Sequence, residues 1–180
     1  MKRLSFIGYF ACVFGLASWS HAQAVPTASR AGLGQIGVGV TMASPDYAQK
    51  NIKGITIYGS FDFTRHWGIE GDIHKVSILT PTDIGEDSYL LGPRYVFRHN
   101  RFSPYAKGLL GFGRFQYQPD NAPYATYTYK IYSLGGGLDI QATQHINIRA
   151  IDLEYQKWPG FPTTGLTPIV GTIGVAYAFR

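Results

Sequence analysis

Large apolar residues alternate with small or polar residues along much of the chain. The clearest case is the last stretch, T-P-I-V-G-T-I-G-V-A-Y-A-F-R over residues 167–180. From Ile169 onward every second residue is apolar or glycine, and the residues between them are small. A period of two is typical of a β-strand, here with one apolar face and one face of small residues. The stretch therefore predicts a strand that ends in two aromatic residues, Tyr177 and Phe179.

The same alternation recurs seven times before this stretch, so we expect eight strands. They cover residues 35–42, 53–63, 67–76, 87–97, 104–117, 127–140, 145–157 and 167–180. The connections alternate between long and short, which gives four long loops and three short turns. This is the pattern of an outer-membrane barrel with both termini in the periplasm and its long loops outside. Strands of roughly ten residues also match the length that a tilted strand needs to cross a bilayer.

The predicted fold class is therefore all-β, a closed eight-stranded antiparallel up-and-down transmembrane barrel. In such a barrel the large apolar residues face lipid, and the small and charged residues face the lumen. Aromatic residues concentrate at the two membrane boundaries, and we expect Trp67, Trp158, Tyr177 and Phe179 to lie there.

The N-terminus predicts export. Lys2 and Arg3 precede an apolar run that ends at Trp19, and small residues follow, so residues 1–24 read as a signal peptide cleaved after Ala22 or Ala24. Residues 25–180 then form a single barrel domain. The one cysteine lies in the removed segment, so the mature chain has no disulfide and no cysteine metal site. Removal of the two basic residues lowers the formal charge from +5 to +3.

Composition narrows the partners. An exported chain with 22 glycines and 15% aromatic residues, without a helical period, is typical of a membrane barrel in the bacterial outer membrane. No basic run remains that would predict binding to nucleic acid. We expect the partners to be outer-membrane lipids and lipopolysaccharide, together with the barrel-assembly machinery, and we expect no cofactor. The partner of the long loops is not specified by the sequence.

Charged residues recur on the face opposite the large apolar ones. The lumen of an eight-stranded barrel is just filled by side chains, and charges there must be paired because an isolated buried charge is costly. An Arg or Lys side chain that faced lipid at the bilayer midplane would destabilise the barrel by about 2–4 kcal/mol. We therefore expect an internal network that blocks the lumen, formed by Asp62, Glu70, Asp72, Arg94, Lys107, Asp139, Arg149, Asp152 and Glu154.

Several segments resemble the eight-stranded transmembrane domain of the OmpA and OmpX type. They are G-I-E-G at 68–71, G-P-R-Y at 92–95, G-G-L-D at 136–139, L-E-Y-Q-K-W at 153–158 and G-V-A-Y-A-F at 174–179. The resemblance implies an interior ionic cluster of two acids and two bases, at Glu70, Arg94, Asp139 and Arg149. It also implies that the terminal aromatics, Tyr177 and Phe179, form the signal read by the assembly machinery.

One departure from that family leaves two alternatives. The segment L-E-Y-Q lies two residues farther from Arg149 than the family pattern requires. Either a β-bulge near Ala150 and Ile151 restores the alternation, or Asp152 and Glu154 take part in the cluster instead.

The sequence favours a structural or surface-interaction role over catalysis. The candidate catalytic histidines are His66, His74, His99 and His145, and none stands with a nucleophile and an orienting acid at the predicted outer rim. The histidines are too scattered to predict a metal site. The alternatives are a soluble lipocalin-like carrier, a narrow pore and a lipid-modifying enzyme. A carrier would place its large apolar residues inside and its charges outside.

Overall fold

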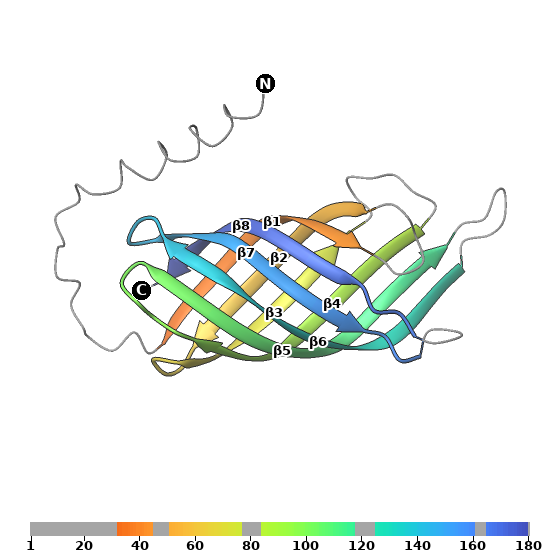
Figure 1. The fold of residues 1–180 in the computed structure, drawn as a ribbon, viewed down its shortest axis with the longest axis horizontal. Helices are drawn as coiled ribbons and strands as arrows, with labels where there is room; N and C mark the ends of the chain where they lie inside the picture. The colour runs from red at the N-terminus through yellow and green to blue at the C-terminus, as the bar shows by residue number, and fades with distance from the viewer. Residues whose placement is uncertain (1–31, 45–50, 77–83, 118–124, 161–164, 180) are drawn as a thin grey trace, which may run out of the picture.

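The computed structural model describes residues 32–44, 51–76, 84–117, 125–160 and 165–179 and contains eight β-strands there (Figure 1). They are β1 (Leu33–Ser44), β2 (Ile52–Asp62), β3 (Trp67–Lys75), β4 (Ile84–Val96), β5 (Phe102–Tyr117), β6 (Ala125–Gln141), β7 (Ile146–Lys157) and β8 (Ile169–Phe179). All eight predicted strands are confirmed, with small differences at their ends. The predicted signal peptide, residues 1–24, lies outside the described residues and stays a prediction.

The strands form one closed antiparallel sheet in chain order. Each strand pairs with its sequence neighbours, and β8 pairs with β1 from Gly34↔Phe179 to Ser44↔Ile169. Closure leaves no strand edge unpaired, as lipid requires, because free backbone N–H and C=O groups find no water there. The predicted fold class is confirmed. Among the described residues, no helix has the length and apolar character needed to cross a membrane.

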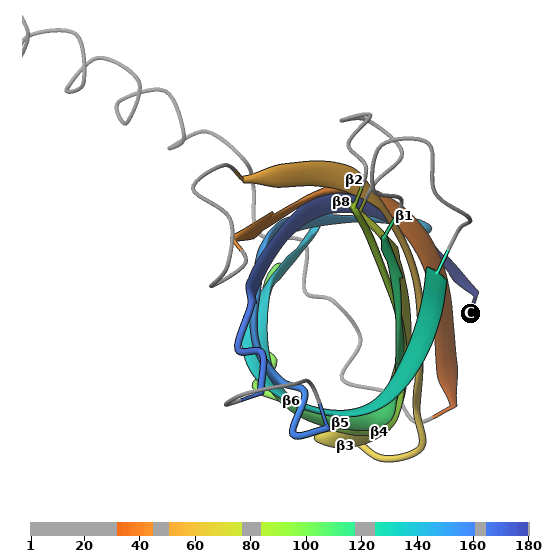
Figure 2. The same ribbon diagram turned by 90° about the vertical axis from the view of Figure 1, so that its right-hand side faces the viewer.

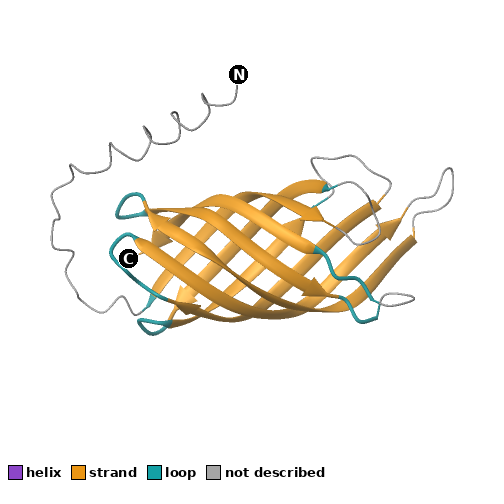
Figure 3. Cartoon of the chain, in the orientation of Figure 1, coloured by secondary structure: helices purple, strands orange, loops and turns teal. Residues whose placement is uncertain are grey.

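The two ends of the barrel carry different connections (Figures 1 and 3). The short-turn end holds the turns 63–66, 97–101 and 142–145 and the last residue of β8. The opposite end, which we call the long-connection end, receives the connections 45–51, 76–83, 118–124 and 158–168. Figure 2 views the barrel from the long-connection end and shows the ring of strands around the lumen.

The outer wall is apolar and the lumen is charged. Outward side chains such as Leu110, Leu134 and Ile173 are 60–71% exposed, whereas Glu70 and Arg149 are at most 1% exposed. Every second residue points outward because side chains alternate across a strand. This arrangement suits a barrel surrounded by lipid. In a water-soluble carrier it would expose the apolar wall to water, so it contradicts the lipocalin-like alternative.

A β-bulge in β7 decides which residues of that strand face the lumen. Asp139 of β6 pairs with Arg149, but the preceding residue of β6, Leu138, pairs with Ile151, so Ala150 has no partner on β6. The register also breaks against β8 between Arg149 and Asp152. The extra residue turns Arg149 and Asp152, three positions apart, to the same side of the sheet. The bulge of the first alternative is therefore present, and Asp152 and Glu154 face the lumen as the second alternative requires.

Candidate functional site in the barrel lumen

Lys107 of β5 lies at the centre of the lumen among four carboxylates. Its Nζ atom is 2.6 Å from oxygens of Asp72 and Asp152, 2.8 Å from Glu154 and 3.0 Å from Glu70. These side chains are at most 2% exposed and come from β3, β5 and β7. Each charge has lost its water, and the opposite charges beside it offset that cost. The cluster therefore ties opposite walls of the barrel together.

Two arginines join this cluster from the short-turn side. Arg149 donates from both terminal nitrogens to the two oxygens of Glu70, at 3.0 Å each, and contacts Asp139 at 3.2 Å and Asp152 at 3.1 Å. Arg94 lies 2.6 Å from Asp139 and 3.1 Å from Glu70. The structure thus brings together the four positions implied by the OmpA resemblance, and Glu70 contacts the cations of both arginines and of Lys107.

The rings of two tyrosines pack against the guanidinium groups of the two arginines. The guanidinium carbon of Arg149 lies 3.7 Å from the ring centroid of Tyr58 and 5.0 Å from that of Tyr105, and the guanidinium carbon of Arg94 lies 4.1 Å from Tyr105. Arginine stacks well on aromatic rings because its charge is planar and weakly hydrated. Gly37 makes room for this packing, since a Cβ there would lie 2.4 Å from the Tyr58 ring. Parity along β2 and β5 places both tyrosines inside, but no signal in the sequence predicted their contacts with the arginines.

His74 extends the polar network toward the long-connection end. Its Nδ1 is 2.6 Å from the Thr56 hydroxyl, and hydrogen bonds join Thr56 to Thr41 and Thr41 to Thr172. Its Nε2 lies 3.2 Å from Oε1 of Glu154. The sequence predicted no metal-ligand set, but the fold places ligand atoms of Asp72, His74 and Glu154 within 4.8 Å of one another. Spacing could not show this, because Glu154 lies on a strand across the lumen.

On the long-connection side of the charged network, the lumen is closed by apolar side chains, which we call the apolar plug. It comprises Leu90, Leu109, Ile131, Trp158 and Leu166, each at most 4% exposed. The Trp158 indole donates a hydrogen bond to Gln156 at 3.2 Å, which links the plug to the network below. The expectation that Trp158 anchors the outer surface at the membrane boundary is therefore wrong. Trp158 directly follows β7 and pairs with Leu166. Its side chain continues the inward-facing series of β7, so the ring lies in the lumen.

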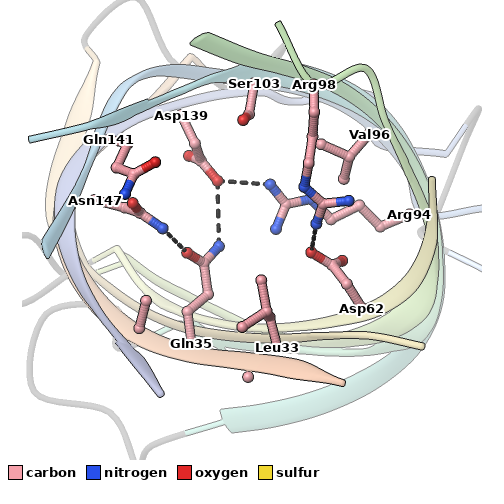
Figure 4. Close-up of a pocket in the computed structure, with 12 residues that line it drawn as sticks. Leu33, Gln35, Asp62, Arg94, Val96, Arg98, Ser103, Asp139, Gln141 and Asn147 are labelled. Atoms are coloured by element: carbon pink, nitrogen blue, oxygen red, sulfur yellow. Dashed lines mark hydrogen bonds and ion pairs between the residues drawn. The ribbon is translucent and has the colours of Figure 1, made fainter. Parts of the chain in front are cut away.

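The short-turn end opens into a small polar pocket, shown in Figure 4. Gln35 bridges Asn147 and Asp139 there, at 2.8 Å and 3.2 Å, and Arg98 forms an ion pair with Asp62. Partial burial lowers the pKa of the Arg98 guanidinium, although the neighbouring Asp62 carboxylate opposes that shift. The pocket ends on Arg94 and Asp139, which belong to the central network.

The remaining candidate residues lie outside the lumen. Tyr177 and Phe179 point outward from β8, each about half exposed, with their rings edge to face at 5.2 Å. His145 stacks on Tyr177 and His66 on Tyr95, both at the short-turn end. Along with His99, they occupy the short turns and lie away from the long-connection end.

Solved structures show the same architecture. Ail of Yersinia pestis aligns with a TM-score of 0.57 and 18% identity, over 83% of this chain and 99% of Ail. OprG of Pseudomonas aeruginosa gives 0.62 and 16%, over 83% of this chain and 97% of OprG. Neisserial surface protein A gives 0.57 and 15%, over 83% and 99%. At these identities the likeness establishes the fold alone.

The sequence itself matches a family model. No curated protein sequence is similar enough to match the chain. The model for the outer membrane protein beta-barrel domain, however, matches residues 10–179, nearly the full length. The predicted location and the predicted kind of barrel are confirmed by this match. The chain belongs to the outer membrane protein beta-barrel domain family and is an integral protein of the bacterial outer membrane.

Proposed function

We propose that this protein is a sealed scaffold that acts through its cell-surface end, and that it neither conducts solutes nor catalyses a reaction. The observation that carries the proposal is the double closure of the lumen. Lys107 and the two arginines, Arg94 and Arg149, cross-link acidic side chains from several strands, and the apolar plug lies beyond them. A solute would have to break paired charges and then displace packed hydrocarbon.

A planar bilayer measurement tests the seal. The full-length protein, purified from outer membranes and inserted into a planar bilayer, is expected to leave the current at the level of a protein-free bilayer. A porin inserted under the same conditions serves as the positive control. Discrete conductance steps that depend on the amount of folded protein would contradict the sealed scaffold and favour the narrow pore.

Surface interaction would occur at the long-connection end, because long loops of outer-membrane barrels face outward. The crystal structure of Ail contains the heparin analogue sucrose octasulfate. The long connections of this chain carry one lysine, Lys50, against the three acids Asp46, Asp83 and Asp120. This balance does not favour a polyanion. The loops also contain Tyr47, Pro81, Tyr124 and Phe161, which suit contacts with less charged surfaces, such as those of proteins.

Loop replacement tests this role. Segments 45–50 and 118–124 are replaced by Gly-Ser segments of equal length, and cells that display each variant are compared for binding to immobilised extracellular proteins. Binding is expected to fall while the heat-dependent shift of the folded barrel on SDS gels stays unchanged. Binding of every tested surface at the wild-type level by both variants would contradict the proposed site of interaction.

The terminal aromatics are proposed as the assembly signal. Phe179 is the last residue of β8, faces outward and pairs with Gly34 near the start of β1, where it would be accessible before closure. Phe179→Ala is expected to reduce the folded protein in outer membranes several-fold but leave refolding in detergent intact. Phe63→Ala is the matched control, because Phe63 is also half exposed at the same end. Equal loss for both variants would argue against a signal.

The absence of a catalytic role is supported by where the histidines lie. His74 is fully buried in the network, and His66, His99 and His145 lie at the short-turn end. Comparison of lipid A from cells with and without the protein tests this point. Identical lipid A is expected, and a change in its acylation that requires the protein would overturn it.

A further inference from the structure

The central network carries more negative than positive charge. Five carboxylates, Glu70, Asp72, Asp139, Asp152 and Glu154, face three permanent cations, Arg94, Lys107 and Arg149. With every carboxylate ionised and His74 neutral, two negative charges at these buried positions would be left uncompensated. A buried charge without a counter-charge is strongly unfavourable, so bound protons or a bound cation would stabilise the network.

His74 indicates where that positive charge belongs. The hydroxyls of Thr56, Thr41 and Thr172 form a chain that ends at Nδ1 of His74. When this chain accepts the Nδ1 proton, Nε2 presents a lone pair to the lumen. Nε2 lies 3.2 Å from Oε1 of Glu154, yet it makes no hydrogen bond of acceptable geometry. A proton on Nε2 or a bound cation would join these two atoms.

Asp72 completes the set. Its Oδ2 receives Lys107, but its Oδ1 is buried without a hydrogen-bond partner among the described residues. Ligand atoms of Asp72, His74 and Glu154 all lie within 4.8 Å of one another. We propose that Asp72, His74 and Glu154 form a buried binding site for one divalent transition-metal ion. The proposal goes beyond the sealed scaffold and is independent of it.

The donor set and its surroundings define the class of ion. One imidazole nitrogen and two carboxylates suit zinc, or manganese and cobalt, better than the all-oxygen ligands that calcium prefers. Thr56 would orient the imidazole from its other nitrogen, as the outer partners of metal-bound histidines commonly do. A divalent ion would also neutralise the two negative charges that remain when every carboxylate is ionised and His74 is neutral. Lys107 lies beside the site and would weaken binding by charge repulsion.

Metal analysis of the folded protein tests the site. The full-length chain is refolded in detergent from metal-free urea with Zn²⁺ or Co²⁺ present, and Zn²⁺ is separately added after folding, because the buried site has two closed ends. After removal of free ion, about one ion per chain is expected, and Co²⁺ is expected to give a visible absorption band. Asp72→Asn and His74→Gln are expected to lose at least tenfold in bound metal.

His145→Gln is the matched control, because it removes an imidazole at the short-turn end and leaves the three ligands in place. It is expected to keep the full amount of metal. Folding of each variant is verified by its heat-dependent gel shift. Failure of the wild-type protein to retain metal by either route overturns the proposal even if the variants do not fold. Equal metal loss in His145→Gln also overturns it.

Discussion

The lumen is closed by two layers of opposite chemistry. The central network joins eight charged side chains through ion pairs, with His74 beside Glu154, and the apolar plug packs five hydrophobic side chains without a charge. Both layers are almost fully buried, so exposure does not distinguish them. They differ in how they respond to the loss of one member.

The network depends on its complete set of partners. Removal of one cation leaves several carboxylates without compensation in a medium of low dielectric constant, and the remaining charges repel one another. The plug is held by dispersion and by exclusion of water, so its loss scales with the volume removed. The two layers of the lumen therefore differ in how stability is lost. Removal of a single charge is expected to destabilise the network strongly, whereas the plug is expected to lose stability in proportion to the volume removed.

The largest effect is expected for Lys107→Met, which removes the ammonium and keeps a chain of similar length. Glu70, Asp72, Asp152 and Glu154 would then face one another, at a cost of about 3–5 kcal/mol in the free energy of unfolding. Urea titration in lipid vesicles, followed by the gel mobility of the folded form, measures this. Lys75→Met is the control, because the Lys75 side chain is 39% exposed and forms its ion pair with Asp87 at the wall, away from the central network. Similar losses for the two variants would contradict the comparison.

Trp158→Ala is expected to rank second, with a loss of about 3 kcal/mol by the same titration, since it leaves a large cavity in the plug. Trp67→Ala tests the difference between a tryptophan in the lumen and one on the outer wall. Trp67 is 51% exposed and packs edge to face on Tyr95, so its loss is expected to be smaller. If Trp67→Ala cost as much or more, the plug would not be a main support of the fold.

Gly113→Ala is expected to cost about 2 kcal/mol, because a Cβ at this position would lie 2.3 Å from the Trp158 ring and force the plug apart. Gly108→Ala on the same strand is the control. Its Cβ would meet only Leu134, at an ordinary 3.5 Å, so little change is expected. Unfolding titrations of the pair report the tightness of the plug, and equal stabilities would show that Trp158 moves aside freely.

The smallest effect is expected at the short-turn end, for Arg98→Met. The Arg98–Asp62 pair borders the polar pocket with each side chain 11% exposed, more than the central network, so its loss should cost only about 1 kcal/mol and should shrink in high salt. Parallel titrations at low and high salt measure this. A salt-independent loss as large as that of Lys107→Met would remove the distinction between the mouth and the centre.

The sequence by itself determined the strands, their order and which residues face inward. A period of two is a local property, so parity alone assigned Glu70, Arg94 and Lys107 to the lumen and Leu110 to lipid. The alternation of long and short connections also gave an up-and-down order. An apolar residue that faces inward, such as Leu109 in the plug, cannot be assigned to the lumen from its hydrophobicity.

Only the tertiary structure decided which of the inward residues meet. Parity does not state how far along the barrel each side chain lies, because that level depends on strand register, tilt and bulges. The bulge at Ala150 sets Asp152 beside Lys107, and closure of the barrel brings Glu154 across the lumen to His74. Closure of the barrel also places the Trp158 ring within the apolar plug. The chain's local pattern therefore fixes the wall, and the three-dimensional register fixes the contents of the lumen.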